Sequence, residues 1–249
     1  MSTPPSFDYS AVRALLVDID DTVVRFKPGV PTDSLFGALR QAAVRLGGLT
    51  PAEAERRIEE VKKQERWWHW SDFIVALDVN PKEFWRYAVE LERKNLEPTG
   101  PEIGRALRRL HKAGYRLYAT SNNPSSGILY KLSIVGLATI QGAPLFDQLL
   151  GATELHAMKW EPGYWKKVLA HTGLDAGEVA IVGDDPRDDL EVPHSIGIAH
   201  TFLINRHDDL SERDSERVTH VRGFDRVAEC LLASAPLPQG KAPAVYAAA

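Results

Sequence analysis

Cysteine is almost absent from this sequence, which has a single one, Cys230, among 249 residues. One cysteine cannot form a disulfide within the chain, so the disulfide framework of a small secreted domain is excluded. The amino terminus also lacks the basic start and the apolar stretch of a secretory signal. We therefore expect a cytoplasmic protein.

Long apolar runs and an excess of positive charge are missing as well. No apolar run reaches the roughly 18–20 residues that a membrane-spanning helix needs, and the run at residues 11–17 is interrupted by Arg13. Lysine and arginine number 30 against 34 aspartate and glutamate residues, which gives a net charge of −4. No global positive field would attract nucleic acid or an anionic membrane. We expect a soluble protein that binds neither.

What the sequence does contain is enough apolar material for a core, since hydrophobic residues make up 44% of it. Four apolar runs predict buried strands, because they are short and lack helical spacing: residues 13–18, 116–121, 148–151 and 179–184. Helical patterns lie between them, at residues 101–113, 124–137 and 161–172. This alternation predicts an α/β fold, with a parallel sheet covered by helices on both faces.

The stretch from residue 28 to residue 97 breaks the alternation, because it carries helix signals and no strand signal. Two helix starts are marked by an N-cap, a proline and a capping-box glutamate, in TPAE at residues 50–53 and NPKE at residues 80–83. We predict an inserted subdomain of three or four helices. Residues 234–249, rich in proline and alanine, are expected to form a flexible tail.

Acidic residues cluster where two predicted strands end. The first strand runs into Asp18 and Asp20, and the strand at residues 179–184 runs into Asp184, Asp188 and Asp189. Alone, the first cluster would be read as a polar turn whose aspartates cap the next segment. Two such clusters at one edge of a parallel sheet repel one another unless a cation intervenes. A hard cation such as Mg²⁺ suits them, because it takes one or two carboxylates and leaves room for phosphate oxygens.

Two further segments suit a phosphate group. Ser121 and Asn122 follow a strand and precede a helix, where side chains and free amides bind anions. Lys159 precedes another helix and offers a point charge. Taken singly, these would be a helix start and a solvated lysine. With the aspartates they supply a nucleophile, a proton donor, a metal site and phosphate-holding groups, which suffice for phosphoryl transfer through an aspartyl phosphate.

The ordered motifs resemble those of the haloacid dehalogenase superfamily: DxDxT after a strand, a serine often followed by asparagine, a lysine, and GDxxxD or GDxxxxD. The matching residues are Asp18, Asp20, Thr22, Ser121, Asn122, Lys159, Gly183 and Asp184, with Asp188 or Asp189. The resemblance implies a Rossmann-like parallel sheet at residues 1–27 and 98–233, with an α-helical cap inserted at residues 28–97. Trp160 departs from the pattern, because the family usually has proline there.

The resemblance also implies a role for each residue in phosphate chemistry. Asp18 would attack phosphorus, and Asp20 would protonate the leaving oxygen and then activate water. The groups expected to hold the phosphoryl group are Ser121, Asn122 and Lys159.

For the metal, the resemblance implies that Mg²⁺ binds the Asp18 carboxylate, the Asp20 backbone carbonyl and Asp184. The last ligand would be Asp189 or Asp188. Asp189 is preferred, because it starts the segment DLEVP, which aligns with the family's Asp-apolar-x-x-Ala/Pro pattern.

Asp20 favours phosphate over carbon–halogen chemistry, because dehalogenases of the family need no proton donor at that position. We predict a Mg²⁺-dependent phosphatase acting on a small phosphorylated metabolite. Two alternatives stay open, namely a phosphomutase of the same superfamily and a non-catalytic regulatory protein on the same fold. The aromatic residues at 67–70 and 84–85 are interpreted as cap packing or a dimer contact, or else as a wall that stacks on the substrate. The oligomeric state is not predicted.

Overall fold

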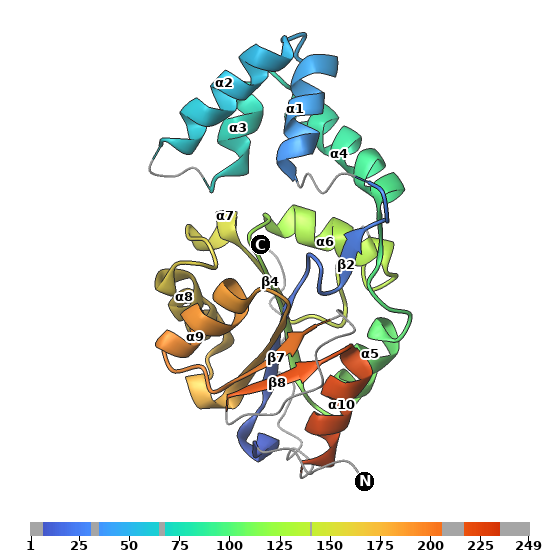
Figure 1. Cartoon of the computed structure of the whole chain (residues 1–249), viewed down its shortest axis with the longest axis vertical. Helices are drawn as coiled ribbons and strands as arrows, with labels where there is room; N and C mark the ends of the chain where they lie inside the picture. The colour runs from blue at the N-terminus through green and yellow to red at the C-terminus, as the bar shows by residue number, and fades with distance from the viewer. Residues whose placement is uncertain (1–6, 31–34, 65–67, 140, 206–216, 235–249) are drawn as a thin grey trace.

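The computed structural model describes residues 7–30, 35–64, 68–139, 141–205 and 217–234. Figure 1 shows an elongated molecule in which a group of helices lies above an α/β layer. Except for Ser234, the tail predicted at residues 234–249 lies outside the described residues. Within the described residues, no helix is both long and apolar enough to cross a membrane.

A six-stranded parallel sheet forms the centre of the α/β layer, with the order β5-β4-β1-β6-β7-β8. Its strands are β1 (Ala14–Asp18), β4 (Arg116–Ser121), β5 (Gln148–Gly151), β6 (Val179–Gly183), β7 (His200–Ile204) and β8 (Val218–Val221). The prediction of a parallel α/β fold is confirmed. Strands β1, β4 and β6 are neighbours, so the ends of three predicted motif strands meet at one edge.

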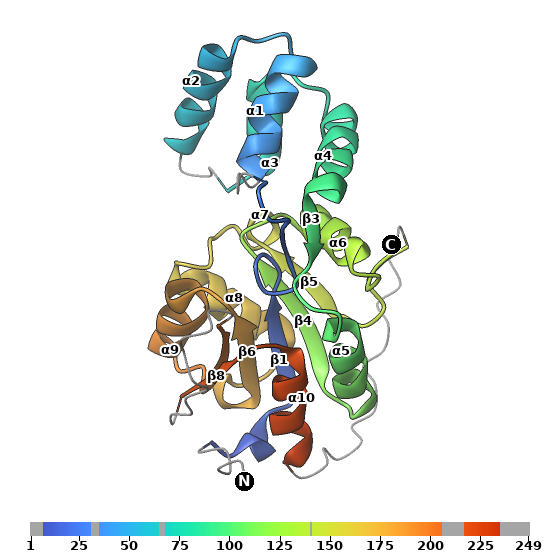
Figure 2. The ribbon, with the colours of Figure 1, turned by 45° about the vertical axis from the view of Figure 1, so that its right-hand side comes forward.

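Helices cover both faces of this sheet, as Figure 2 shows for α5 and α10 on one side and α8 and α9 on the other. Alternate residues of β1 serve the two faces: Leu15 and Val17 pack in one apolar cluster, Ala14 and Leu16 in the other. The helices are α5 (Ile103–Lys112), α6 (Ser125–Ile134), α7 (Ala152–Leu155), α8 (Pro162–Thr172), α9 (Val192–Ser195) and α10 (Phe224–Ala233). Among the described residues of the layer there are also three short helical turns: η1 (Tyr9–Ala11), η2 (Ala176–Glu178) and η3 (Pro186–Glu191).

In the described part of the chain between the first and second motif strands lie four helices: α1 (Leu35–Arg45), α2 (Pro51–Lys62), α3 (Trp70–Ala76) and α4 (Pro81–Asn95). Both predicted helix starts are capped, since Thr50 accepts a hydrogen bond from the Glu53 amide (3.3 Å) and Asn80 from the Lys82 amide (3.0 Å). The four helices share an apolar cluster of their own, which includes Trp70 and Phe84. We call them the cap; the division into domains at residues 28–97 and 98–233 stays a prediction.

The expectation that residues 28–97 contain no strand is wrong at the end of that range. Strand β3 (Leu96–Pro98) pairs antiparallel with β2 (Val24–Phe26). A three-residue strand that ends in proline carries no alternation to detect, and its partner lies about 70 residues away in the sequence. These two strands are the crossings between the core and the cap.

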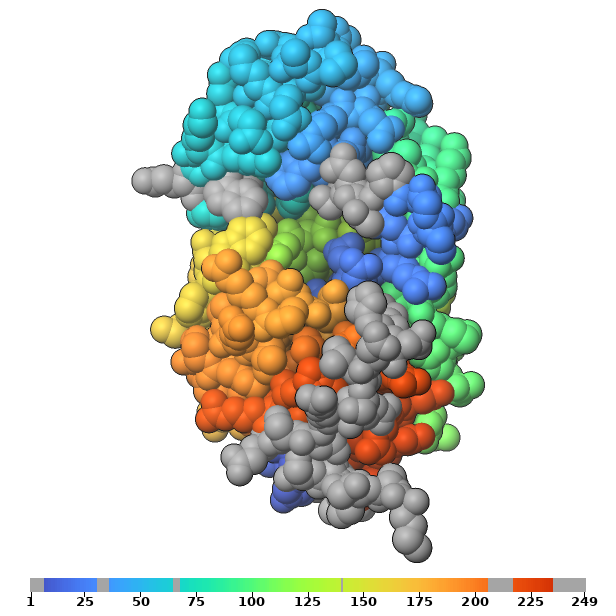
Figure 3. All heavy atoms as spheres, viewed as in Figure 1, coloured from blue at the N-terminus to red at the C-terminus, as the bar shows by residue number. Residues whose placement is uncertain are grey.

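A second junction lies on the opposite side of the cap. The Thr153 hydroxyl of α7 donates a hydrogen bond of 2.9 Å to the backbone carbonyl of Trp68, which precedes α3. Figure 3 shows the cyan cap atoms meeting the yellow atoms of this part of the core. The cap therefore contacts the core on both sides of the edge where the motif strands end.

Candidate active site

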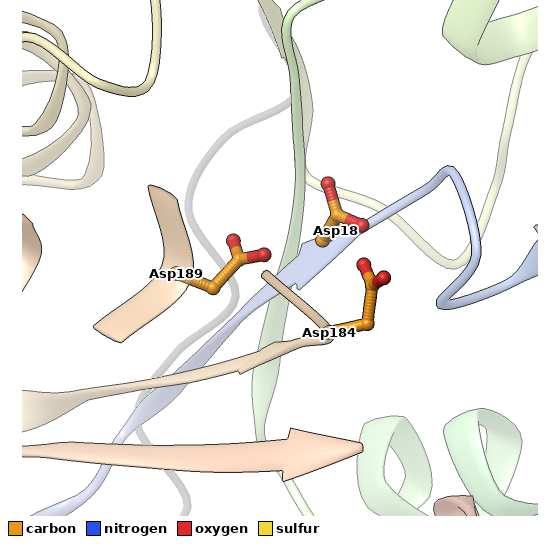
Figure 4. Close-up of side chains that lie close together, drawn as sticks. All are labelled: Asp18, Asp184 and Asp189. Atoms are coloured by element: carbon orange, nitrogen blue, oxygen red, sulfur yellow. The ribbon is translucent and has the colours of Figure 1, made fainter. Parts of the chain in front are cut away.

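Three aspartates converge at the carboxyl edge of the sheet, as Figure 4 shows. Asp18 ends β1, Asp184 follows β6, and Asp189 lies on η3. A carboxylate oxygen from each lies within 4.8 Å of the others. Gly183 makes this approach possible, because a Cβ atom there would lie 2.2 Å from the Asp189 carboxyl carbon. This position admits only glycine while η3 folds back on the strand.

The structure distinguishes the two candidate aspartates of the last motif. Asp189 is fully buried and belongs to the carboxylate cluster, whereas Asp188 accepts a hydrogen bond of 2.9 Å from the Asn122 side chain. Asp185 starts η3 by accepting hydrogen bonds from the Arg187 and Asp188 amides, both at 2.8 Å. This turn directs Asp189 inward and Asp188 toward the loop after β4.

Lys159 lies inside the carboxylate cluster. Its Nζ is 2.6 Å from Asp18 Oδ1 and 2.6 Å from Asp189 Oδ1, and the residue is only 3% exposed. Burial opposes its charge, but the two carboxylates outweigh burial and hold the pKa of Lys159 well above its usual range. Its backbone is fixed as well: the amide donates to Asn122 Oδ1 (2.8 Å) and the carbonyl accepts from Trp165 Nε1 (2.8 Å).

The residues after β4 form a hydrogen-bonded loop beside the cluster. The buried Ser121 hydroxyl accepts from the backbone and side-chain amides of Asn123, both at 3.0 Å. Asn122 uses its side-chain amide to join Lys159 to Asp188. The side chain of Asn122 therefore positions the other groups, and its contact with phosphate stays a prediction, as do those of Ser121 and Lys159.

Asp20 is not one of the three clustered carboxylates. One of its oxygens accepts a hydrogen bond of 2.6 Å from Asn123 Nδ2, and the other forms an ion pair with Lys131 of α6. Its side chain is 42% exposed, so the carboxylate remains accessible. Any contribution of Asp20 to a metal site would come from its backbone carbonyl, which stays a prediction.

Sequence reasoning missed Asn123 and Lys131 as partners of Asp20. Asn123 sits beside the predicted pair Ser121 and Asn122, and in the sequence its place directly before Pro124 is typical of a helix start. Lys131 did give a signal, because it shares the buried face of α6 with Gly127, Ile128 and Leu132 at helical spacing. A lysine on an apolar helix face needs a negatively charged partner, and here that partner is Asp20.

The three-carboxylate cluster fits a metal ion. Burial, together with the neighbouring carboxylates, raises the pKa of Asp184 to about 7 and that of Asp189 to about 8. Lys159 alone therefore does not compensate the carboxylates, although its Nζ lies 2.6 Å from Asp18 Oδ1 and from Asp189 Oδ1. Oxygen ligands of this kind suit a hard cation. The cluster can hold a divalent ion between Asp18, Asp184 and Asp189.

These raised pKa values predict how a cation stabilises the protein at different pH. Between the usual 3.8 and about 8, the metal-free folded state binds protons at Asp184 and Asp189 that the unfolded state has released. The contribution of these groups to the free energy of unfolding therefore falls as pH rises through this window. A cation binds the ionised form, so the gain in Tm on adding Mg²⁺ to EDTA-treated protein should be larger at pH 8 than at pH 5.

The quantity to measure is the difference in Tm between Mg²⁺ and EDTA at each pH. Burial lowers the pKa of His200 to about 3, so the contribution of His200 to the free energy of unfolding rises with pH, and the difference in Tm cancels it. Asp184→Asn should lose the gain in Tm. Asp188→Asn is the matched control and should keep it, since Asp188 lies outside the cluster. A gain that is independent of pH and survives Asp184→Asn would place the cation elsewhere.

Comparison with known proteins agrees with this geometry. Residues 12–197 match the family model of the haloacid dehalogenase-like hydrolases. A HAD phosphatase from Thermococcus onnurineus is similar in structure, with a TM-score of 0.63 and 24% identity over 91% of this chain and 100% of that one. Among curated protein sequences, none matches this chain.

Two dehalogenases are also similar in fold. The 2-haloacid dehalogenase from Pseudomonas syringae pv. Tomato DC3000 has a TM-score of 0.63 and 18% identity over 89% of this chain and 99% of that one. The L-2-haloacid dehalogenase from Xanthobacter autotrophicus, with chloropropionic acid covalently bound, has a TM-score of 0.56 and 15% identity over 90% and 100%. These similarities show the fold alone. The residues of the site are what can distinguish phosphate chemistry from halide chemistry.

Proposed function

Because this chain belongs to the haloacid dehalogenase-like hydrolases, we propose that it is a Mg²⁺-dependent phosphatase. Its substrate would be a small phosphorylated metabolite, hydrolysed through an aspartyl phosphate on Asp18. The observation that carries the proposal is the position of Asp20. Its accessible carboxylate lies two residues after the nucleophile and is held by Asn123 and Lys131 outside the metal cluster.

A carboxylate in this place serves phosphate esters and not alkyl halides. The alcohol oxygen that leaves phosphorus carries a developing negative charge and needs a proton, whereas a halide ion leaves without one. Asp20 can supply this proton because it is accessible and does not share the cluster of Asp18, Asp184 and Asp189. This supports phosphate ester hydrolysis over dehalogenation.

The two chemical steps follow from these residues. A carboxylate oxygen of Asp18 attacks phosphorus, and the bond from phosphorus to the alcohol oxygen breaks. That oxygen keeps the electron pair of the broken bond and takes a proton from the carboxyl group of Asp20. Asp20, now a carboxylate, removes a proton from water, whose oxygen attacks the phosphorus of the aspartyl phosphate. The acyl phosphate bond then breaks, releasing inorganic phosphate and restoring the Asp18 carboxylate.

The surrounding groups would hold the transferring phosphoryl group. Burial raises the pKa of Asp18, and the Lys159 ammonium opposes this by favouring the ionised nucleophile. Lys159 pairs with Asp18 and offers positive charge beside the reacting oxygens, and the loop at Ser121 supplies polar groups next to it. A divalent ion held by Asp18, Asp184 and Asp189 would supply further positive charge for the phosphate oxygens.

We expect activity to require both a divalent metal ion and a phosphate ester as substrate. With Mg²⁺, the purified protein should release phosphate from 4-nitrophenyl phosphate and from members of a panel of phosphorylated metabolites. EDTA should abolish this release and Mg²⁺ should restore it, because the clustered carboxylates repel both one another and the phosphate when no cation is bound. Colorimetric phosphate detection measures the result.

The competing activities are tested in parallel. Halide release from 2-chloropropionate, without phosphate release from any ester, would identify a dehalogenase. Isomerisation of a sugar phosphate faster than its hydrolysis would identify a phosphomutase. Absence of all three would favour a non-catalytic protein on this fold, and full activity in EDTA would contradict the metal site.

A further inference from the structure

Lys131 is a fully buried lysine outside the motifs that define the candidate active site. It lies on α6, is 2% exposed, and pairs with one oxygen of Asp20. Burial opposes its charge, yet the neighbouring carboxylates hold the pKa of Lys131 above its usual range. Burying a lysine ammonium costs free energy, which an ion pair with a half-exposed carboxylate recovers only in part. The presence of this lysine therefore calls for a role other than stability.

Glu92 supplies a second negative charge, and it comes from the cap. It lies on α4 and is 6% exposed. Burial raises its pKa, the Lys131 ammonium lowers it, and the Asp20 carboxylate raises it again. Both the Lys131 ammonium and the Asp20 carboxylate therefore act electrostatically on Glu92. The backbone carbonyl of Val89, one turn before Glu92, accepts a hydrogen bond from Tyr130 of α6, which joins the two helices.

We propose that Lys131, compensated by Glu92, is a positioning residue that fixes the Asp20 carboxylate for proton transfer to the leaving oxygen. A half-exposed aspartate would otherwise sample several rotamers. Here Asn123 holds one oxygen and Lys131 the other, so the carboxylate has one orientation. The positioning depends on the docked cap, because Glu92 lies on α4 while Lys131 and Asn123 belong to the core. The role rests on the proposed phosphatase function.

The leaving group of the substrate provides the test. The ratio kcat/KM reports the steps up to departure of the leaving group, so it isolates the proton donation by Asp20. 4-Nitrophenolate leaves without a proton, whereas the phenolate of phenyl phosphate is more basic and benefits from one. Lys131→Met should lower kcat/KM for phenyl phosphate by about 10²-fold and for 4-nitrophenyl phosphate by less than about tenfold. Lys131→Arg keeps the positive charge and should therefore recover part of the kcat/KM for phenyl phosphate that Lys131→Met loses.

Two further variants separate positioning from folding. Ser133→Ala is the matched control, because it removes a side-chain hydrogen bond within α6, from the Ser133 hydroxyl to the Tyr130 carbonyl (2.6 Å), and leaves Asp20, Lys131 and Glu92 intact; it should affect both substrates equally. Glu92→Gln should shift the substrate ratio in the same direction as Lys131→Met, by a smaller factor. Lys131→Met could fail to fold because Asp20 and Glu92 lose their positive partner. In that case the double variant Lys131→Met with Glu92→Gln, which removes one of the two negative charges, replaces it in the test.

The outcomes distinguish this role from the proposed function. Equal losses on both substrates in Lys131→Met would make Lys131 merely structural and overturn the inference. If the wild-type protein releases no phosphate from any ester, the proposed function fails. In that case crystal structures of the wild type and of Lys131→Met test the positioning. The Asp20 carboxylate should lose its hydrogen bond to Asn123 in the variant, and an unchanged orientation of Asp20 would by itself overturn the inference.

Discussion

Replacing Asp18 with asparagine should abolish phosphate release, with kcat falling by about 10⁴-fold or more. The amide oxygen is a far weaker nucleophile than the carboxylate, so no covalent intermediate would form. The substitution is nearly isosteric, and Lys159 keeps its ion pair with Asp189, so the fold should survive. Phosphate release measures the activity, and thermal unfolding in EDTA checks that the variant is folded.

Asp21→Asn is the matched control for this variant. Asp21 lies in the same loop but outside the carboxylate cluster, and its φ of 52° is a left-handed conformation that asparagine adopts readily. This variant should retain activity within about tenfold of the wild type. If Asp18→Asn keeps wild-type phosphatase activity, Asp18 is not the nucleophile and the aspartyl-phosphate mechanism is wrong.

Much of this site could be predicted from the sequence because it lies at the ends of strands. A short apolar run that ends in aspartate identifies both a buried strand and the polar edge where it stops. Parallel neighbours then bring distant motifs together without further information: Asp18 and Asp184 meet because β1 pairs with β6. The full strand order is not needed for this prediction, because it is enough that the motif strands are neighbours in the sheet.

The contacts of Asp20 could not be obtained in the same way. Lys131 reaches Asp20 through the packing of α6 within the core, and the charge of Glu92 reaches both through the packing of the cap on the core. In sequence, a lysine on a helix is most often solvated, and only its place on the apolar face of α6 indicates otherwise. Side-chain direction also decided between Asp188 and Asp189, through the turn that Asp185 caps.

The two strands beyond the last motif were missed for another reason. Strand β7 begins with His200, and β8 has the sequence VTHV, so neither is an uninterrupted apolar run. Two of their polar side chains are hydrogen-bonded within the core, where the Tyr9 hydroxyl lies 2.8 Å from Thr219 Oγ1 and 3.1 Å from His200 Nε2. Burial of a histidine in such a network depends on partners more than 190 positions away in sequence, and no local pattern reports it.

Replacing Asp20 with asparagine should fail differently from replacing Asp18, because the nucleophile remains. With 4-nitrophenyl phosphate, whose leaving group needs no proton, the attack of Asp18 should still occur. Asparagine cannot remove a proton from water, so hydrolysis of the aspartyl phosphate should stall and the phosphoenzyme should accumulate. Intact-protein mass spectrometry after rapid acid quenching should show an added mass of about 80 Da, the mass of one phosphoryl group.

The variant with both Asp18→Asn and Asp20→Asn locates the adduct. It should show no added mass, because the only carboxylate able to receive the phosphoryl group has been removed. Phenyl phosphate supplies a second comparison: the adduct on Asp20→Asn should form more slowly with this ester, since its departing oxygen lacks the proton that Asp20 gives. Normal turnover by Asp20→Asn would show that another group moves both protons, and the observation that carries the proposed phosphatase function would then be lost.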